Sequence, residues 1–295
     1  MTEKAVTKLE ELNLADRFLF SETMEDGEVY QAAVSILLEN EIHLKDRPET
    51  EKELRVSPQL RQIRLDVVSM DRSGTLYCTE MQKRNTGNLQ KRSRYYQAQL
   101  DVSLLEPGSK DFNLLNDSCF ILIAPFDLFG YGLYRYTFEG TCRECPDLKI
   151  GDGAIRVFIN TKGENGQEFS REFLDFMEYI TESTDEAANK TDSRRIKLIH
   201  ERVREIRKSE KTGVKYMQLW EEMAYVREEG LEEGENKKLI QIVCRMLQKG
   251  NRPEKIADSL EESIDCIKKI DRAAQECAYD CDKIYAKLAG EQVYG

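Results

Sequence analysis

The sequence lacks most of the features that would assign it at once to a class of proteins. Its 295 residues include two histidines, one tryptophan and six prolines. No run of about 18 apolar residues occurs, so we expect no membrane span. The first residues, Met1-Thr-Glu-Lys-Ala-Val-Thr-Lys8, lack the apolar stretch of a secretion signal. We therefore expect a cytoplasmic protein that does not bind membranes.

Metal-binding and nucleophile motifs are also scarce. Cys142-Arg-Glu-Cys145 is a single CxxC pair, and a zinc site would need a second pair, for instance Cys277 and Cys281 on a later helix. Neither histidine lies close to it in the sequence, and no glycine-rich phosphate loop is present. We interpret the eight cysteines as reduced thiols that pack as small hydrophobic side chains.

The charge balance narrows the choice of partners. A net charge of -11 argues against non-specific adhesion to polyanions over the whole surface, but it leaves room for a basic patch confined to one face. Hydrophobic residues make up 40% and charged residues 34% of the chain, which is typical of a packed core joined to solvated helices.

The hydrophobic pattern predicts an α/β first half and an α-helical second half. Helical spacing covers 10–45, and a polar stretch with Pro48 follows. Next come a hairpin over 60–83, a helix over 89–105 and strands at 119–124, 133–138 and 155–159. Charged helices begin near 169, and an acidic stretch with glycines at 227–235 indicates a weak helix or hinge. We place domains at 1–165, 166–232 and 233–295.

The C-terminal module has its own helix signals. An apolar stripe ends at Gly250, Asn251-Arg-Pro-Glu254 carries the start signals of a second helix, and Ser263 can cap a third. The alternation of helix and turn signals in this module is typical of a DNA-binding helix-turn-helix. Its exposed face is acidic, however, which favours a packing or oligomerisation module over entry into a DNA groove.

The hairpin carries polar side chains inside apolar strands. Asp66 lies between Leu65 and Val67, and Glu80 and Gln82 share one face of the second strand. One interpretation is a polar face turned to water. The other is a site where Asp66, Glu80 and Gln82 converge, because two facing carboxylates repel unless a cation such as a divalent metal lies between them.

A basic segment follows the hairpin directly. It contains Lys83, Arg84, Lys91, Arg92 and Arg94 in an otherwise acidic protein. Positive side chains next to a carboxylate pair suit a phosphodiester substrate, because the flanking phosphates need Lys and Arg. The alternative is a solvated helix face.

The order of these residues resembles the PD-(D/E)xK nuclease superfamily, and more narrowly the bacterial recombination-promoting nuclease (transposase) family. The resemblance covers most of the chain and is strongest over 14–163. Its motifs are Asp16-Arg-Phe18, Arg64-Leu-Asp66-Val, Glu80-Met-Gln82, Arg94-Tyr-Tyr96, Phe120-Ile-Leu-Ile123, Tyr134-Arg-Tyr136 and Leu148-Lys-Ile-Gly-Asp-Gly153. Leu19 stands where the family's early motif usually has Lys.

The resemblance implies a restriction-endonuclease-like core with a central mixed sheet flanked by helices. It also implies that Asp66 and Glu80 bind Mg²⁺, with Mn²⁺ as a substitute, and that Gln82 stands at the position of the superfamily's lysine. A neutral amide can orient groups and donate hydrogen bonds but cannot supply a positive charge. For a third carboxylate the candidates are Glu39, ranked first, Glu28 and Asp16.

The function implied is a Mg²⁺-dependent DNA endonuclease linked to recombination or mobile elements. Arg84, Lys91, Arg92 and Arg94 would hold the DNA backbone, and cutting both strands would favour a homodimer. Two other functions remain open. One is an interaction protein that kept the nuclease fold and lost efficient cleavage, and the other is a DNA-binding regulator that acts through its C-terminal helices.

Overall fold

The computed structural model describes residues 7–55, 61–105 and 108–292. The chain forms two compact units, Met1–Tyr216 and Met217–Gly295. Helix α7 (Glu210–Gln248) begins in the first unit and continues into the second. Each unit has a hydrophobic core of its own.

A six-stranded mixed sheet forms the centre of the first unit, with the strand order β1-β2-β3-β4-β6-β5. Strands β3, β4 and β6 are parallel, β2 runs antiparallel to β1 and β3, and β5 runs antiparallel to β6. The strands are β1 (Glu49–Leu54), β2 (Ile63–Met70), β3 (Leu76–Met81), β4 (Ser118–Ala124), β5 (Arg135–Phe138) and β6 (Ala154–Asn160). The predicted α/β class with a central mixed sheet is confirmed.

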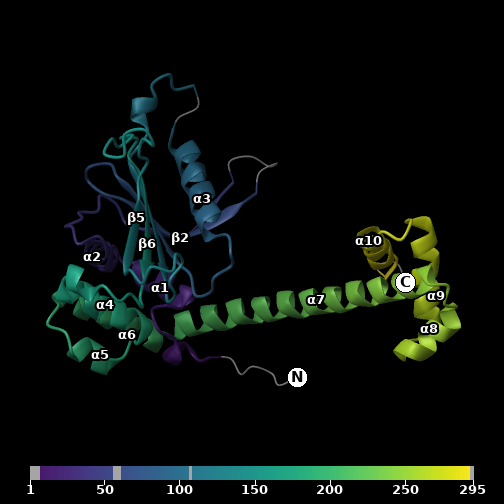
Figure 1. Cartoon of the computed structure of the whole chain (residues 1–295). Helices are drawn as coiled ribbons and strands as arrows, with labels where there is room; N and C mark the ends of the chain where they lie inside the picture. The colour runs from purple at the N-terminus through teal and green to yellow at the C-terminus, as the bar shows by residue number, and fades with distance from the viewer. Residues whose placement is uncertain (1–6, 56–60, 106–107, 293–295) are drawn as a thin grey trace. The chain divides into compact units, whose positions relative to one another are not determined.

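Helices lie on both faces of this sheet, with α3 on one side and α2 on the other (Figure 1). On the α2 side, Tyr30 and Thr79 join their hydroxyl groups at 2.9 Å. The helices of the first unit are α1 (Arg17–Met24), α2 (Gly27–Leu38), α3 (Leu89–Leu104), α4 (Arg171–Thr181), α5 (Asp185–Asn189) and α6 (Arg194–Lys208), with short 3₁₀ turns η1 (Leu9–Glu11), η2 (Phe112–Leu114) and η3 (Gly166–Glu168).

The predicted hairpin is present as β2 and β3, and its turn follows from local chemistry. The carboxylate of Asp71 accepts hydrogen bonds from the backbone N–H groups of Ser73 and Thr75, both at 2.9 Å. Gly74 adopts a φ of +92°, a conformation that favours glycine. The continuous apolar run predicted as a buried strand is β4, in which every residue is buried.

The N-terminal helical segment differs from its prediction. It is divided into α1 and α2, because Asp16 and Asp26 each accept a backbone N–H and so begin a new helix. The polar stretch with Pro48, which interrupts the helical spacing, runs into β1, a strand that was not predicted from the sequence. This strand is an edge strand whose side chains are mostly charged, a common property of exposed sheet edges, so it carries no apolar alternation.

The second unit is helical, as predicted. Its helices are the later part of α7, then α8 (Pro253–Leu260), α9 (Ile264–Glu276) and α10 (Cys281–Gln292). Ser263 caps α9 by accepting the N–H of Cys266 at 3.1 Å, which confirms that prediction. Asn251 does not cap α8. The cap position is Arg252, and the Asn251 amide instead donates to the Met246 carbonyl.

Helix α7 is continuous over 39 residues, including the glycine-containing stretch 227–235. The expected weak helix or hinge is therefore helical throughout. Its glycines are surrounded mainly by glutamate and leucine, which favour helix. Within the residues that the structure describes, no helix combines the length and apolar character needed to cross a bilayer.

Candidate functional site

Asp66 and Glu80 lie side by side where the hydrogen-bond ladder between β2 and β3 opens. The paired residues run from Met70↔Leu76 to Val67↔Thr79, and beyond that point the two carboxylates take the place of backbone acceptors. The N–H of Asp66 donates to Oε1 of Glu80 at 3.0 Å. The N–H of Met81 donates to Oδ2 of Asp66 at 2.9 Å. The two residues predicted to hold a metal are thus neighbours in space.

Both carboxyl groups are almost completely buried, with exposed fractions of 1% for Asp66 and 4% for Glu80. Burial disfavours the charged form and raises the pKa of Asp66 to about 6, against the opposing effect of Arg17. For Glu80, burial and the charge of Asp66 raise the pKa to about 8. The pair therefore tends to hold a proton near neutral pH unless another cation replaces it.

Arg17 supplies positive charge at this pair from the first position of α1. Its Nε donates to Oδ1 of Asp66, and one terminal nitrogen lies 3.4 Å from Oε2 of Glu51. Although burial opposes it, the negative charges of Asp66, Glu51 and Glu80 raise the pKa of Arg17. Arg17 belongs to the sequence motif Asp16-Arg-Phe18, but no role at the site was predicted for it. Its position directly after Asp16, the residue that caps α1, places it there.

Glu51 is a third carboxylate at the site that sequence patterns did not indicate. It lies across from Asp66, between the pairs Thr50↔Val67 and Lys52↔Leu65. Its φ is +51°, which is uncommon for a residue with a side chain, so the edge strand is distorted at this point. Its carboxylate accepts hydrogen bonds from Ser21 and Arg17 and forms an ion pair with Arg64 at 2.7 Å.

Gln82 follows the end of β3 and connects the hairpin to α3. Its side-chain N–H donates to the Arg84 carbonyl at 2.7 Å, while its side-chain oxygen accepts a hydrogen bond from Arg92. The charge of Arg92 also opposes the rise in the pKa of Glu80. Gln82 therefore brings a cation from α3 toward the carboxylate pair.

The other predicted DNA contacts are surface groups. Arg84, Lys91 and Arg94 are exposed, whereas Arg92 is half-buried. Lys83 lies 3.6 Å from Asp16, so the residue after Gln82 contacts the start of α1. The basic segment thus divides into a solvent-facing group and one arginine turned toward the site.

The first-ranked third carboxylate of the sequence prediction, Glu39, has other contacts. It accepts the backbone N–H of Ser170 at 2.8 Å and lies 3.5 Å from Arg135. Glu28 is exposed in the first turn of α2. Asp16 caps α1 and lies 3.6 Å from Lys83. The third carboxylate near Asp66 and Glu80 is Glu51, not Glu39.

The donor set is compatible with Mg²⁺, which commonly takes one or two protein carboxylates and keeps several waters. Backbone donors use Oδ2 of Asp66 and Oε1 of Glu80, and Arg17 uses Oδ1 of Asp66, so a metal would have to replace Arg17 at Asp66. The described part of the chain contains no group of three or more His, Cys, Asp or Glu arranged to hold a metal. A metal here would therefore depend on water and substrate oxygens for its remaining ligands.

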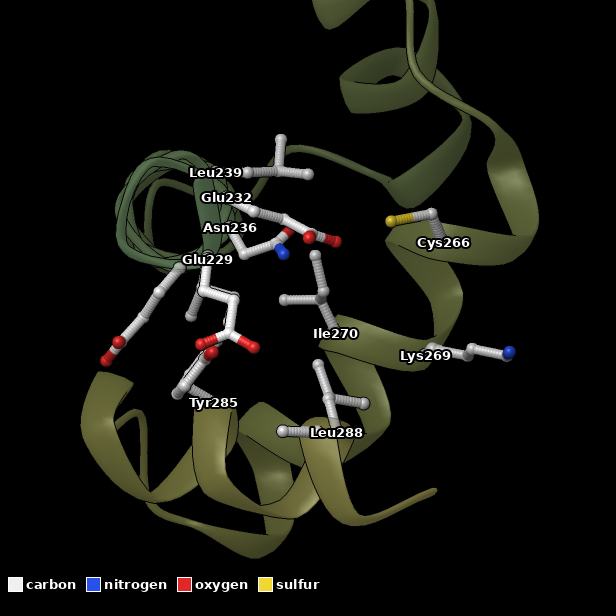
Figure 2. A pocket seen from close by; sticks show the side chains of 12 residues that line it. Glu229, Glu232, Asn236, Leu239, Cys266, Lys269, Ile270, Tyr285 and Leu288 are labelled. Carbon is white, nitrogen blue, oxygen red and sulfur yellow. The ribbon is translucent and has the colours of Figure 1, made fainter. Parts of the chain in front are cut away.

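A hollow of about 660 Å³ lies within the C-terminal unit. The apolar side chains of Ile270 and Leu288 point into it, and Glu229 and Glu232 of α7 lie at its border (Figure 2). Its lining has no buried carboxylate pair comparable with that of the sheet. The candidate site is therefore the carboxylate pair of the first unit, where the pairing of β2 and β3 ends.

Comparison with known proteins gave no match: no family model fits the chain, and neither a curated protein nor a solved structure proved similar to it.

Proposed function

We propose that this chain is a Mg²⁺-dependent DNA endonuclease with a restriction-endonuclease-like core, associated with recombination or mobile elements. The observation that carries the proposal is the buried pair Asp66 and Glu80 at the opened end of the hairpin ladder, with Arg17 and Arg92 beside it. Burying two carboxylates lowers the free energy of unfolding. A role in binding a cation would account for their presence in the core.

Each residue has a distinct part in this proposal. Asp66 and Glu80 would hold the metal, Glu80 through the oxygen that no backbone donor uses and Asp66 through Oδ1, from which the metal would displace Arg17. The metal, when bound, polarises a phosphate oxygen and makes a water molecule more acidic. Arg17 balances negative charge at the carboxylate pair, while Arg84, Lys91, Arg92 and Arg94 hold the DNA backbone.

The reaction is a hydrolysis that consumes one water molecule. The water oxygen forms a bond to phosphorus as the bond from phosphorus to one ester oxygen breaks. The attacking water loses a proton to solvent, and the departing oxygen takes one up. The products are one strand end with a phosphate and one with a hydroxyl group.

Plasmid cleavage tests this proposal with isosteric variants. In Mg²⁺ or Mn²⁺ the wild-type protein should convert supercoiled plasmid to nicked or linear forms, and EDTA should stop the reaction. Asp66→Asn and Glu80→Gln should each lower the rate by at least about 100-fold, because each removes a ligand charge from the metal. Glu39→Gln is the matched control, since Glu39 contacts Arg135 and Ser170 instead.

A cleavage activity that persists in both isosteric variants would refute the assignment of the site. An absence of cleavage by wild-type protein would favour the second candidate, an interaction protein with a nuclease fold. The engagement of Asp66 by Arg17 is the observation that favours this candidate, because an internal cation already neutralises the carboxylate. Such a protein would bind DNA or another partner without cutting it.

A further inference from the structure

Arg92 differs from the other basic residues of the segment that follows the hairpin. It is half-buried on α3, whereas Lys91 and Arg94 on the same helix are exposed. Its guanidinium lies over the ring of Tyr96, 5.6 Å from the ring centroid. The aromatic ring and the carbonyl oxygen of Gln82 thus fix the group from two sides.

One donor of this fixed guanidinium remains unused. The Nε of Arg92 is buried and has no hydrogen-bond partner among the described residues. A buried N–H without an acceptor is unfavourable, and an anionic oxygen is the acceptor that a guanidinium binds best. A substrate oxygen would supply the missing acceptor once the Arg92 side chain turns toward it, and the charge of Arg92 already opposes the rise in the pKa of Glu80.

Gln82 is neutral, so the positive charge at this position has to come from another residue. Its amide can orient a neighbour, but it cannot stabilise the negative charge that develops on the phosphate during hydrolysis. Its side chain instead spans two arginines, accepting from Arg92 and donating to the Arg84 carbonyl. This places the charge that residue 82 lacks on the neighbouring helix.

We infer that Arg92 is a catalytic residue that contacts the scissile phosphate from α3, and that Gln82 is a positioning residue that holds its guanidinium. The inference rests on the proposed function and adds to it the source of positive charge at the reacting group. Arg92 then acts on the rate of cleavage, whereas Arg94 acts on DNA affinity.

Single-turnover cleavage at saturating DNA and Mg²⁺ separates these two effects. Arg92→Met should lower the cleavage rate about 100-fold with little change in DNA affinity, a typical loss for one charge-stabilising donor. Arg92→Lys should recover part of the rate, because it restores the charge without the planar fork. The matched control, Lys110→Met, removes an exposed cation outside the site and should leave both DNA affinity and the saturated rate within about twofold of wild type.

A double variant that exchanges the positions of the amide and the cation gives a further test. Gln82→Lys with Arg92→Gln places the positive charge at residue 82 instead of on α3. This double variant should cleave at least about tenfold faster than Arg92→Gln alone. A purely structural role for Arg92 would not produce this recovery. Thermal melting of every variant checks that the fold is intact, and the double variant and Arg92→Lys decide the matter if Arg92→Met does not fold.

The outcomes separate this inference from the proposed function. If wild-type protein cleaves, and Arg92→Met changes only DNA affinity, the role of Arg92 is refuted and the endonuclease function stands. The same holds if the double variant shows no recovery. If wild-type protein neither cleaves DNA nor binds Mn²⁺ in a calorimetric titration, both the function and the role of Arg92 are refuted.

Discussion

At the scale of single residues, the site is defined by an excess of negative charge in a buried place. Asp66, Glu80 and Glu51 form a row across three neighbouring strands, and Arg17 contacts two of them directly. Asp66 and Glu80 are the most buried of the three, so their ionised forms depend most on a nearby cation. The protonation of these two carboxyl groups should therefore affect the free energy of unfolding as well as the activity.

The pKa of Glu80 predicts how stability depends on pH. Because its pKa is raised to about 8 in the folded protein, from an ordinary 4.5, the folded state retains a proton that the unfolded state has lost between these values. The stabilising contribution is complete below about pH 4.5 and is lost as the pH rises through about 8. We expect the metal-free protein to lose a few kcal/mol of unfolding free energy over this range.

Urea denaturation in EDTA at several pH values checks this expectation, with Glu80→Gln as the comparison. The variant carries no titrating group at this position, so the difference in unfolding free energy between variant and wild type should grow in favour of the variant from pH 5 to pH 8. A difference that stays constant, or that grows in favour of wild type, would show that Glu80 is ionised at ordinary pH in the folded protein.

At the scale of helices and strands, the sequence predicts those elements whose side chains carry a pattern. The buried strand β4 was evident because every residue is apolar or small, and the β2–β3 hairpin because its turn has aspartate, serine and glycine in the required order. The edge strand β1 was not predicted because its side chains are mostly charged and partly exposed. No local pattern distinguishes such a strand from a polar loop.

The same distinction applies to the candidate site. Asp66 and Glu80 are on two strands joined by a short turn, so their proximity follows from hairpin pairing and could be predicted. Arg17 and Glu51 reach the site only because α1 and β1 pack beside β2. Glu39 was preferred because it ends an apolar stripe, but the end of α2 places it beside Arg135 instead. Tertiary packing decided these positions.

Helix α7 offers a test of helix propensity at two internal glycines. Neither Gly230 nor Gly234 has any atom within 4 Å of the position that a Cβ would occupy, and neither has a positive φ. Replacing either by alanine should raise the stability of the helix by about 0.5–1 kcal/mol, because alanine loses less backbone entropy on folding.

Gly250 provides the opposite control for this helix. It follows the end of α7 with a φ of +81°, so alanine there would be strained even though the space is open. Thermal melting followed by circular dichroism should show a higher midpoint for Gly230→Ala and Gly234→Ala and a lower one for Gly250→Ala. A lower midpoint for the first two variants would indicate that the helix bends at these glycines.

At the scale of the whole molecule, the two units have separate cores and separate chemistry. The carboxylate pair, its arginines and the basic segment all belong to Met1–Tyr216, whereas the cluster around Val243, Ile256 and Ile267 belongs to the second unit. A protein that cuts DNA through the first unit should therefore tolerate loss of the second. A regulator that reads DNA through its C-terminal helices should not.

Truncation distinguishes these two cases. A fragment of residues 1–224 keeps Tyr216 in contact with Phe18, together with two further turns of α7, so the first unit should fold and retain plasmid cleavage within about tenfold of the full chain. The fragment 217–295 should be helical and melt cooperatively, because it contains a complete apolar core. Fluorescence anisotropy with labelled duplex DNA measures binding by both fragments. If only 217–295 binds DNA, and does so in EDTA, the C-terminal helices are the DNA-binding part and the carboxylate pair is not a nuclease centre.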